Sequence, residues 1–124
     1  MTVAAAVDAG ARILVVDDDP GIKELVAELL ESRGYAVATA ASAEEALETM
    51  ARDPFDLVIS DLHLPGFSGA VLAAHIAREF PALARRVLLL TGDPSMLDGA
   101  VPFLRKPFAV DEMLRAVAAR LSRA

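Results

Sequence analysis

Several polar side chains follow directly on short apolar runs, and together they could bind and transfer a phosphoryl group. These side chains are Asp17, Asp18, Asp19, Asp61, Thr91 and Lys106. Three or four carboxylates brought close together repel one another, and a divalent cation relieves that repulsion. A site with oxygen ligands alone favours Mg²⁺, which also binds phosphate oxygens.

Asp61 is the candidate nucleophile. It follows the apolar run 57–59 and Ser60, and Pro65 and Gly66 then predict a turn. Ligands of open α/β sheets bind at the carboxyl ends of strands, where a carboxylate is not needed for packing. A carboxylate that attacks phosphorus forms an acyl phosphate, which is a known form of covalent catalysis. Mg²⁺ and Lys106 would offset the charge of the phosphoryl oxygens, and Thr91 would supply a hydroxyl donor.

The elements that must position these side chains alternate between strands and helices. Apolar runs predict strands at 12–16, 35–39, 57–61, 87–90 and 101–105. Apolar residues at helical spacing, with capping residues before them, predict helices at 20–33, 43–52, 69–80 and 110–121. The predicted fold class is α/β, a flavodoxin-like three-layer sandwich with helices on both faces of a five-stranded parallel sheet. The order 2-1-3-4-5 follows from the fold type, because periodicity alone does not give it.

Composition limits the classes of protein that fit. The chain has 124 residues, 55% of them hydrophobic, and no cysteine, so we expect a flexible tail at 1–10 and one domain at 11–124. The net charge of −6 and the pI of about 4.8 argue against direct nucleic-acid binding. No apolar run approaches the ~20 residues that a membrane span needs. We therefore expect a cytoplasmic protein that does not insert into a membrane.

Four stretches resemble the receiver domain of two-component response regulators. They are 13–20 (Ile-Leu-Val-Val-Asp-Asp-Asp-Pro), 61–69 (Asp-Leu-His-Leu-Pro-Gly-Phe-Ser-Gly), 89–92 (Leu-Leu-Thr-Gly) and 103–108 (Phe-Leu-Arg-Lys-Pro-Phe). The resemblance covers roughly residues 11–123. It implies that Asp61 is the phosphoacceptor and that Asp17, Asp18, Asp61 and the backbone carbonyl of His63 bind Mg²⁺. It also implies that Lys106 pairs with Asp61.

The resemblance further implies a switch and a set of partners. Thr91 and Phe103 would form the switch, in which the hydroxyl moves toward the phosphoryl group and the ring turns inward. The Lys106–Pro107 bond would be cis. The phosphoryl donor would be a sensor histidine kinase or a histidine phosphotransfer protein, and the downstream partner is not indicated. The chain would be a monomer or weak dimer, and its only chemistry would be its own phosphorylation and dephosphorylation.

One departure from the family pattern concerns the chain between Thr91 and Lys106. These residues are 15 positions apart, which leaves no room for the family's full fourth helix. We therefore expect that helix to be short, irregular or absent. Phe103 lies at the end of this segment, and a plain core aromatic is the alternative to its role in the switch.

Two other functions remain open on the sequence. An aspartate-nucleophile phosphohydrolase of haloacid dehalogenase type would use Asp17 in the Asp-x-Asp of 17–19, and would leave Asp61 without a role. Against it, the Thr-Gly and Gly-Asp elements share one strand end at 91–93, and there is no cap domain. A pseudo-receiver that no longer accepts phosphate would keep the fold, but no expected site residue is missing from this sequence.

Overall fold

A five-stranded parallel sheet forms the centre of the molecule. The computed structural model describes residues 10–97 and 101–121. The strands are β1 (Arg12–Val16), β2 (Ala36–Ala40), β3 (Leu57–Asp61), β4 (Val87–Thr91) and β5 (Phe103–Arg105). Their order is β2-β1-β3-β4-β5, which confirms the predicted topology. The second strand begins one residue later than predicted, and the fifth begins at Phe103 instead of residue 101.

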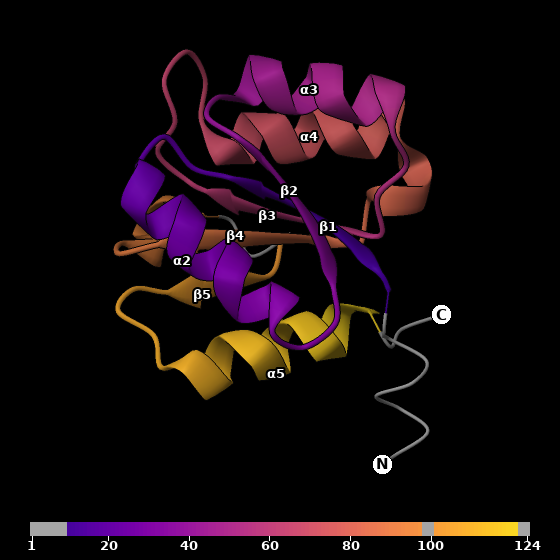
Figure 1. Ribbon diagram of the computed structural model, residues 1–124. Coiled ribbons are helices and arrows are strands. Elements are labelled where there is room, and N and C mark those ends of the chain that lie inside the picture. The colour runs from indigo at the N-terminus through magenta and orange to yellow at the C-terminus, as the bar shows by residue number, and fades with distance from the viewer. Residues whose placement is uncertain (1–9, 98–100, 122–124) are drawn as a thin grey trace.

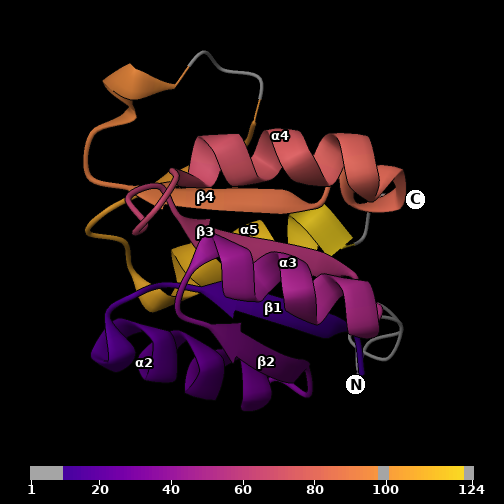
Figure 2. The ribbon, with the colours of Figure 1, turned by 90° about the horizontal axis from the view of Figure 1, so that it is seen from above.

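Helices cover both faces of this sheet, so the predicted three layers are confirmed. The helices are α2 (Pro20–Glu31), α3 (Ala43–Arg52), α4 (Gly69–Glu79) and α5 (Val110–Leu121). Helices α3 and α4 lie on one face, and α2 and α5 lie on the other (Figure 1; Figure 2 shows the same arrangement from above). Among the described helices, none is long and apolar enough to cross a membrane.

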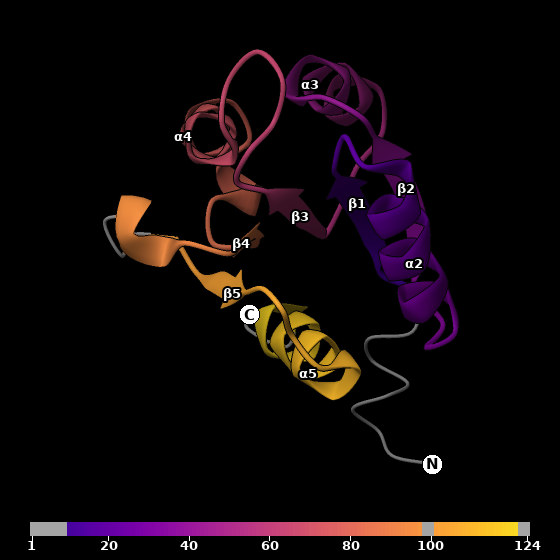
Figure 3. The ribbon, with the colours of Figure 1, turned by 90° about the vertical axis from the view of Figure 1, so that its left-hand side faces the viewer.

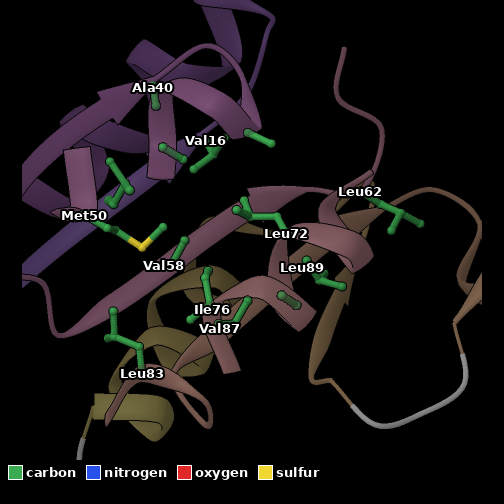
Figure 4. Packing of buried hydrophobic residues seen from close by; sticks show 14 residues of the cluster. Val16, Ala40, Met50, Val58, Leu62, Leu72, Ile76, Leu83, Val87 and Leu89 are labelled. Carbon is green, nitrogen blue, oxygen red and sulfur yellow. The ribbon is translucent and has the colours of Figure 1, made fainter. Parts of the chain in front are cut away.

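The two sheet faces carry separate apolar cores, which explains why the strands read as continuous apolar runs. Along β1, Leu14 and Val16 pack toward α3 and α4, whereas Ile13 and Val15 pack toward α2 and α5. Figure 4 shows the first of these cores, in which Met50 of α3 and Leu72 of α4 cover Val58 of β3. A strand buried on both faces is fixed in register, because a slip of one residue would exchange its two cores.

Side-chain caps fix where three helices begin. Asp19 accepts hydrogen bonds from the N–H groups of Gly21 and Ile22 at the start of α2. Ser42 accepts one from the N–H of Glu45 at the start of α3, and Ser68 accepts one from that of Val71 in α4. Such caps satisfy N–H groups that have no partner within the helix. They confirm the predicted helix starts and fix the loops that leave the sheet.

The connection between β4 and β5 is short, as predicted. In the part of it that the structure describes, the helical piece is a 3₁₀ turn, η2 (Pro94–Met96). Residues 98–100 lie outside the described residues. Another 3₁₀ turn, η1 (Pro81–Leu83), follows α4.

The predicted tail at 1–10 is described only at its last residue. Gly10 donates a hydrogen bond from its N–H to the carbonyl of Gly34, at 2.9 Å. Residues 1–9 lie outside the described residues.

Candidate functional site

The register of the sheet brings the predicted site residues to one edge. Val16 is paired with Ser60, so Asp17 follows β1 beside the end of β3. Asp61 is paired with Leu90, next to Thr91. Thr91 is paired with Arg105, after which Lys106 follows. The loops that follow β3 and β5 lie on the side of the molecule turned to the viewer in Figure 3.

Three carboxylates gather at this edge. Oxygen atoms of Asp17, Asp18 and Asp61 all lie within 4.8 Å of one another. Asp17 is 2% exposed and Asp61 is 8% exposed, whereas Asp18 is exposed. Ligand atoms at this spacing can contact a single cation, and a set made of carboxylate oxygens suits a hard divalent ion.

Asp17 carries the clearest sign that the cluster is built for a cation. Its Oδ1 atom accepts a hydrogen bond from the N–H of Asp19 at 2.9 Å, but its buried Oδ2 atom has no hydrogen-bond partner among the described residues. Burial raises the pKa of Asp17, and the negative charge of Asp61 raises it further. A buried oxygen without a donor is costly. Mg²⁺ fits this donor set, and Asp17, Asp18 and Asp61 would hold it.

Lys106 supplies the positive charge on the other side of Asp61. Its Nζ atom lies 3.0 Å from Asp61 Oδ1, and the two side chains are 34% and 11% exposed. The backbone N–H of Lys106 donates to the carbonyl of Thr91 at 2.8 Å, which ties the end of β5 to the end of β4. The Lys106–Pro107 bond is cis, as the resemblance implied. Asp61 is thus held between an acidic cluster and an ammonium group.

The two predicted switch residues differ in burial. Thr91 is fully buried, and its hydroxyl donates to the carbonyl of Asp93 at 3.2 Å and accepts from the N–H of Asp93 at 3.0 Å. The Phe103 side chain is exposed, with 41% of the residue accessible. It is absent from both apolar cores, so the core-aromatic alternative for Phe103 is wrong.

His63 lies in an exposed loop, and Asp19 lies at the start of α2. His63 is exposed, two residues after Asp61 in the loop that follows β3. The Asp19 side chain caps α2, which accounts for the third aspartate of the 17–19 run.

Two residues beside the site had no predicted role in it. Asp93 binds Thr91 through its backbone, and its carboxylate accepts from the N–H and hydroxyl of Ser95. Gly69 lies against the backbone carbonyl of Asp61. The sequence Asp-Pro-Ser at 93–95 is typical of a capped turn and could have indicated the hydrogen bonds of Asp93. No sequence signal marks the close approach of Gly69 to Asp61, because this contact joins the start of α4 to the end of β3.

Substitution of Asp17 by asparagine should stabilise the metal-free protein by about 1 kcal/mol at neutral pH, because it removes a buried charge beside Asp61. The raised pKa of Asp17 means that the ionised carboxylate destabilises the fold at high pH and that protonation at low pH removes the penalty. The gain should therefore shrink as pH falls. Urea unfolding in the presence of a chelator measures it.

The control for this prediction is Asp18→Asn. Asp18 is exposed, so its substitution should leave the metal-free stability within about 0.5 kcal/mol of wild type. Both variants should lose the stabilisation that Mg²⁺ gives to the wild-type protein, since both remove a carboxylate from the cluster. A metal-free Asp17→Asn protein less stable than wild type would contradict the assigned repulsion.

The fold and site define an α/β domain of the flavodoxin-like class with a carboxylate cluster and a paired lysine at the carboxyl edge of its sheet. The family model described as "Response regulator receiver domain" matches residues 13–118. The chain belongs to this family, and it is therefore a receiver domain of two-component signalling.

Solved structures similar to this chain are receiver domains and response regulators. The response regulator TrrA of Thermotoga maritima, solved in complex with Mg²⁺ and BeF, has a TM-score of 0.81 and 36% identity. That match covers 90% of this chain and 99% of the other. The Vibrio cholerae chemotaxis protein CheY4 has a TM-score of 0.82 and 30% identity, and the match covers 91% of this chain and 100% of CheY4. The receiver domain of the hybrid histidine kinase CckA has a TM-score of 0.77 and 32% identity, and the match covers 90% of this chain and 99% of the CckA domain.

Curated relatives are longer proteins. The transcriptional regulatory protein GlrR of Escherichia coli is 39% identical over an alignment of 114 residues, and the match covers 86% of this chain and 25% of the relative. The transcriptional regulatory protein TcrA of Mycobacterium tuberculosis is 35% identical over an alignment of 121 residues, and the match covers 90% of this chain and 47% of the relative. The chain thus spans between a quarter and a half of the length of these two relatives.

Proposed function

We propose that Asp61 accepts a phosphoryl group from a phosphohistidine and that Asp17, Asp18 and Asp61 bind the Mg²⁺ that this transfer needs. The observation that carries the proposal is the position of Asp61. Its carboxylate contacts Lys106 at 3.0 Å and belongs to a three-carboxylate cluster that spans no more than 4.8 Å. A buried carboxylate between a cation site and a fixed ammonium group suits attack on a phosphate.

The chemistry of the transfer follows from the donors present. Asp61 attacks phosphorus through a carboxylate oxygen, a new O–P bond forms, and the N–P bond of the phosphohistidine breaks with imidazole as the leaving group. Lys106 then pairs with a phosphoryl oxygen, and the Thr91 hydroxyl donates to another. Bound Mg²⁺ would neutralise charge on the phosphoryl oxygens and orient them. The backbone carbonyl of His63 would be a further ligand of the ion.

The wider biology that we propose follows from the family. The phosphoryl donor is a sensor histidine kinase or a histidine phosphotransfer protein, and the phosphorylated domain binds a different partner from the unphosphorylated one. Residues 11–124 form the receiver domain, which acts in the cytoplasm as a monomer or weak dimer without direct contact to nucleic acid. Its chemistry is limited to gain and loss of its own phosphoryl group. Phe103, exposed on β5, is the aromatic side chain that turns inward on phosphorylation.

A phosphohydrolase of haloacid dehalogenase type fits the site less well. The second acid of its Asp-x-Asp motif would be Asp19, and that side chain is already engaged by two N–H groups at the start of α2. Asp17 would be the nucleophile, yet Lys106 pairs with Asp61.

The test is to identify which aspartate is labelled. The protein is incubated with acetyl phosphate and Mg²⁺, the acyl phosphate is trapped by reduction with borohydride, and the modified peptide is located by mass spectrometry. We expect modification at Asp61 alone, and none when a chelator removes Mg²⁺. Modification at Asp17 would establish the phosphohydrolase alternative. A folded protein that is not modified at any Mg²⁺ concentration would be a pseudo-receiver.

A further inference from the structure

The segment Thr91–Ser95, which we call the Thr91 loop, holds the switch hydroxyl in a defined place. Thr91 is fully buried, and its hydroxyl both donates to and accepts from the backbone of Asp93, at 3.2 and 3.0 Å. A hydroxyl has one hydrogen to donate. It therefore has to leave the Asp93 carbonyl before it can donate to a phosphoryl group on Asp61.

The backbone of Asp93 is itself fixed by the Asp93 side chain. Oδ1 of Asp93 accepts from the N–H of Ser95 at 3.1 Å and from the Ser95 hydroxyl at 2.6 Å. Pro94 lies between them at the start of η2, where its ring fixes the backbone. These hydrogen bonds lower the pKa of Asp93, so at neutral pH its carboxylate is charged and accepts strongly. The loop is thus closed by bonds that do not involve Asp61.

We propose that Asp93 is a positioning residue, which acts through Thr91 by holding its hydroxyl in the unphosphorylated arrangement and so opposes the phosphorylated one. The proposal rests on the proposed function, because it assigns regulation to the same site. Each phosphorylation has to displace the Thr91–Asp93 hydrogen bonds, and the Asp93–Ser95 cap sets how difficult that displacement is. Loosening the cap then favours the phosphorylated arrangement.

The first measurement is binding of beryllofluoride in the presence of Mg²⁺, a stable mimic of the phosphoryl group, by the whole chain. Asp93→Ala removes the cap and should tighten binding about 3- to 10-fold, which is the effect of one net hydrogen bond. Ser95→Ala keeps the charge of Asp93 but removes the 2.6 Å hydrogen bond, and it should tighten binding by a smaller factor. Asp93→Asn keeps a capping oxygen and should stay within about twofold of wild type.

Asp93→Asn also separates the cap from electrostatics. After the larger effect of the hydrogen bonds from Ser95, the charges of Arg105 and His63 also lower the pKa of Asp93, so its carboxylate interacts electrostatically with residues near Lys106 and Asp61 in the sequence. If charge alone opposed phosphoryl binding, asparagine and alanine would have equal effects. Asp111→Ala is the matched control, because it removes an exposed carboxylate whose ion pair, within the described part of the chain, is with Arg115 on α5.

A double-mutant cycle tests whether Asp93 acts through Thr91. In a Thr91→Val background the hydroxyl is absent, so Asp93→Ala should change beryllofluoride affinity by less than about twofold. A second readout is the ¹³C shift of the Thr91 methyl group in the Mg²⁺-free protein. In Asp93→Ala we expect it to move part of the way toward its value in beryllofluoride-bound wild type.

The outcomes distinguish the proposed function of the site from the positioning role of Asp93. Wild-type protein that does not bind beryllofluoride with Mg²⁺ would overturn the proposed function, and this inference with it. Wild-type binding together with a folded Asp93→Ala protein of unchanged or weaker affinity would overturn the positioning role alone. Equal effects of Asp93→Asn and Asp93→Ala, or a full Asp93→Ala effect in the Thr91→Val background, would do the same.

Discussion

Substitution of Asp61 by asparagine is expected to abolish phosphoryl uptake from acetyl phosphate, with a loss of at least about 10³-fold in rate. An amide oxygen is a far weaker nucleophile than a carboxylate. Among the residues that the structure describes, no other side chain is placed against both Lys106 and the acidic cluster. The mass of the intact protein before and after incubation measures the result.

Asp17→Asn is the matched comparison, since it makes the same change in the same cluster. It removes a proposed metal ligand but leaves the nucleophile, so labelling of Asp61 should persist at a reduced rate and recover as the Mg²⁺ concentration is raised. Asp61→Asn should not respond to Mg²⁺. Labelling that survives Asp61→Asn but is lost in Asp17→Asn at every Mg²⁺ concentration would contradict the proposed nucleophile.

Misfolding is not expected to explain the loss in Asp61→Asn. The substitution gives up the ion pair with Lys106, whose side chain is one-third exposed, but it also removes a negative charge that raises the pKa of buried Asp17. These effects oppose each other, so the free energy of unfolding should stay within about 1 kcal/mol of wild type. Urea unfolding of the same preparation provides the check.

The parts of this molecule that the sequence predicts are those set by local pattern. Apolar runs that end in Asp17, Asp61 and Thr91 mark strands with a functional carboxyl edge, and a parallel sheet necessarily brings those ends to one side. Capping residues such as Ser42 mark where helices begin, and the observed hydrogen bonds match them. Strand order came from the fold type, because periodicity carries no information on which strands are neighbours.

The orientation of side chains at the site could not be predicted in the same way. The hydroxyl of Thr91 has several possible partners, and only the path of the next two residues brings the Asp93 backbone to it. Phe103 lies in a predicted strand, but the pattern of the strand alone does not indicate that its side chain would be exposed. Asp17 likewise follows an apolar run as Asp61 does, but its unpartnered Oδ2 is evident only in three dimensions.

Gly69 provides the second large expected effect. A Cβ atom at this position would overlap the backbone oxygen of Asp61 and would lie 3.1 Å from the Cα of Leu62. Both atoms belong to the backbone at the end of β3, where the N–H of Gly69 also donates to the carbonyl of Leu62 at 2.7 Å. A flexible side chain could move away, but these atoms cannot move without shifting the strand end that carries the Asp61 carboxylate.

Gly69→Ala should therefore lower the free energy of unfolding by about 2–4 kcal/mol, as measured in urea. Gly21→Ala is the matched control. It makes the same change in the first turn of α2, where the nearest atom to a Cβ would be Asp19 Oδ1 at an ordinary 3.4 Å, and it should stabilise by up to about 1 kcal/mol. The two substitutions differ in sign because helix propensity favours alanine at both sites and only Gly69 meets backbone. Equal effects at the two positions would show that the close approach to Asp61 is not what requires glycine there.

A Gly69→Ala protein that folds should also accept phosphate more slowly than wild type, since the displaced carbonyl and the nucleophilic carboxylate belong to the same residue.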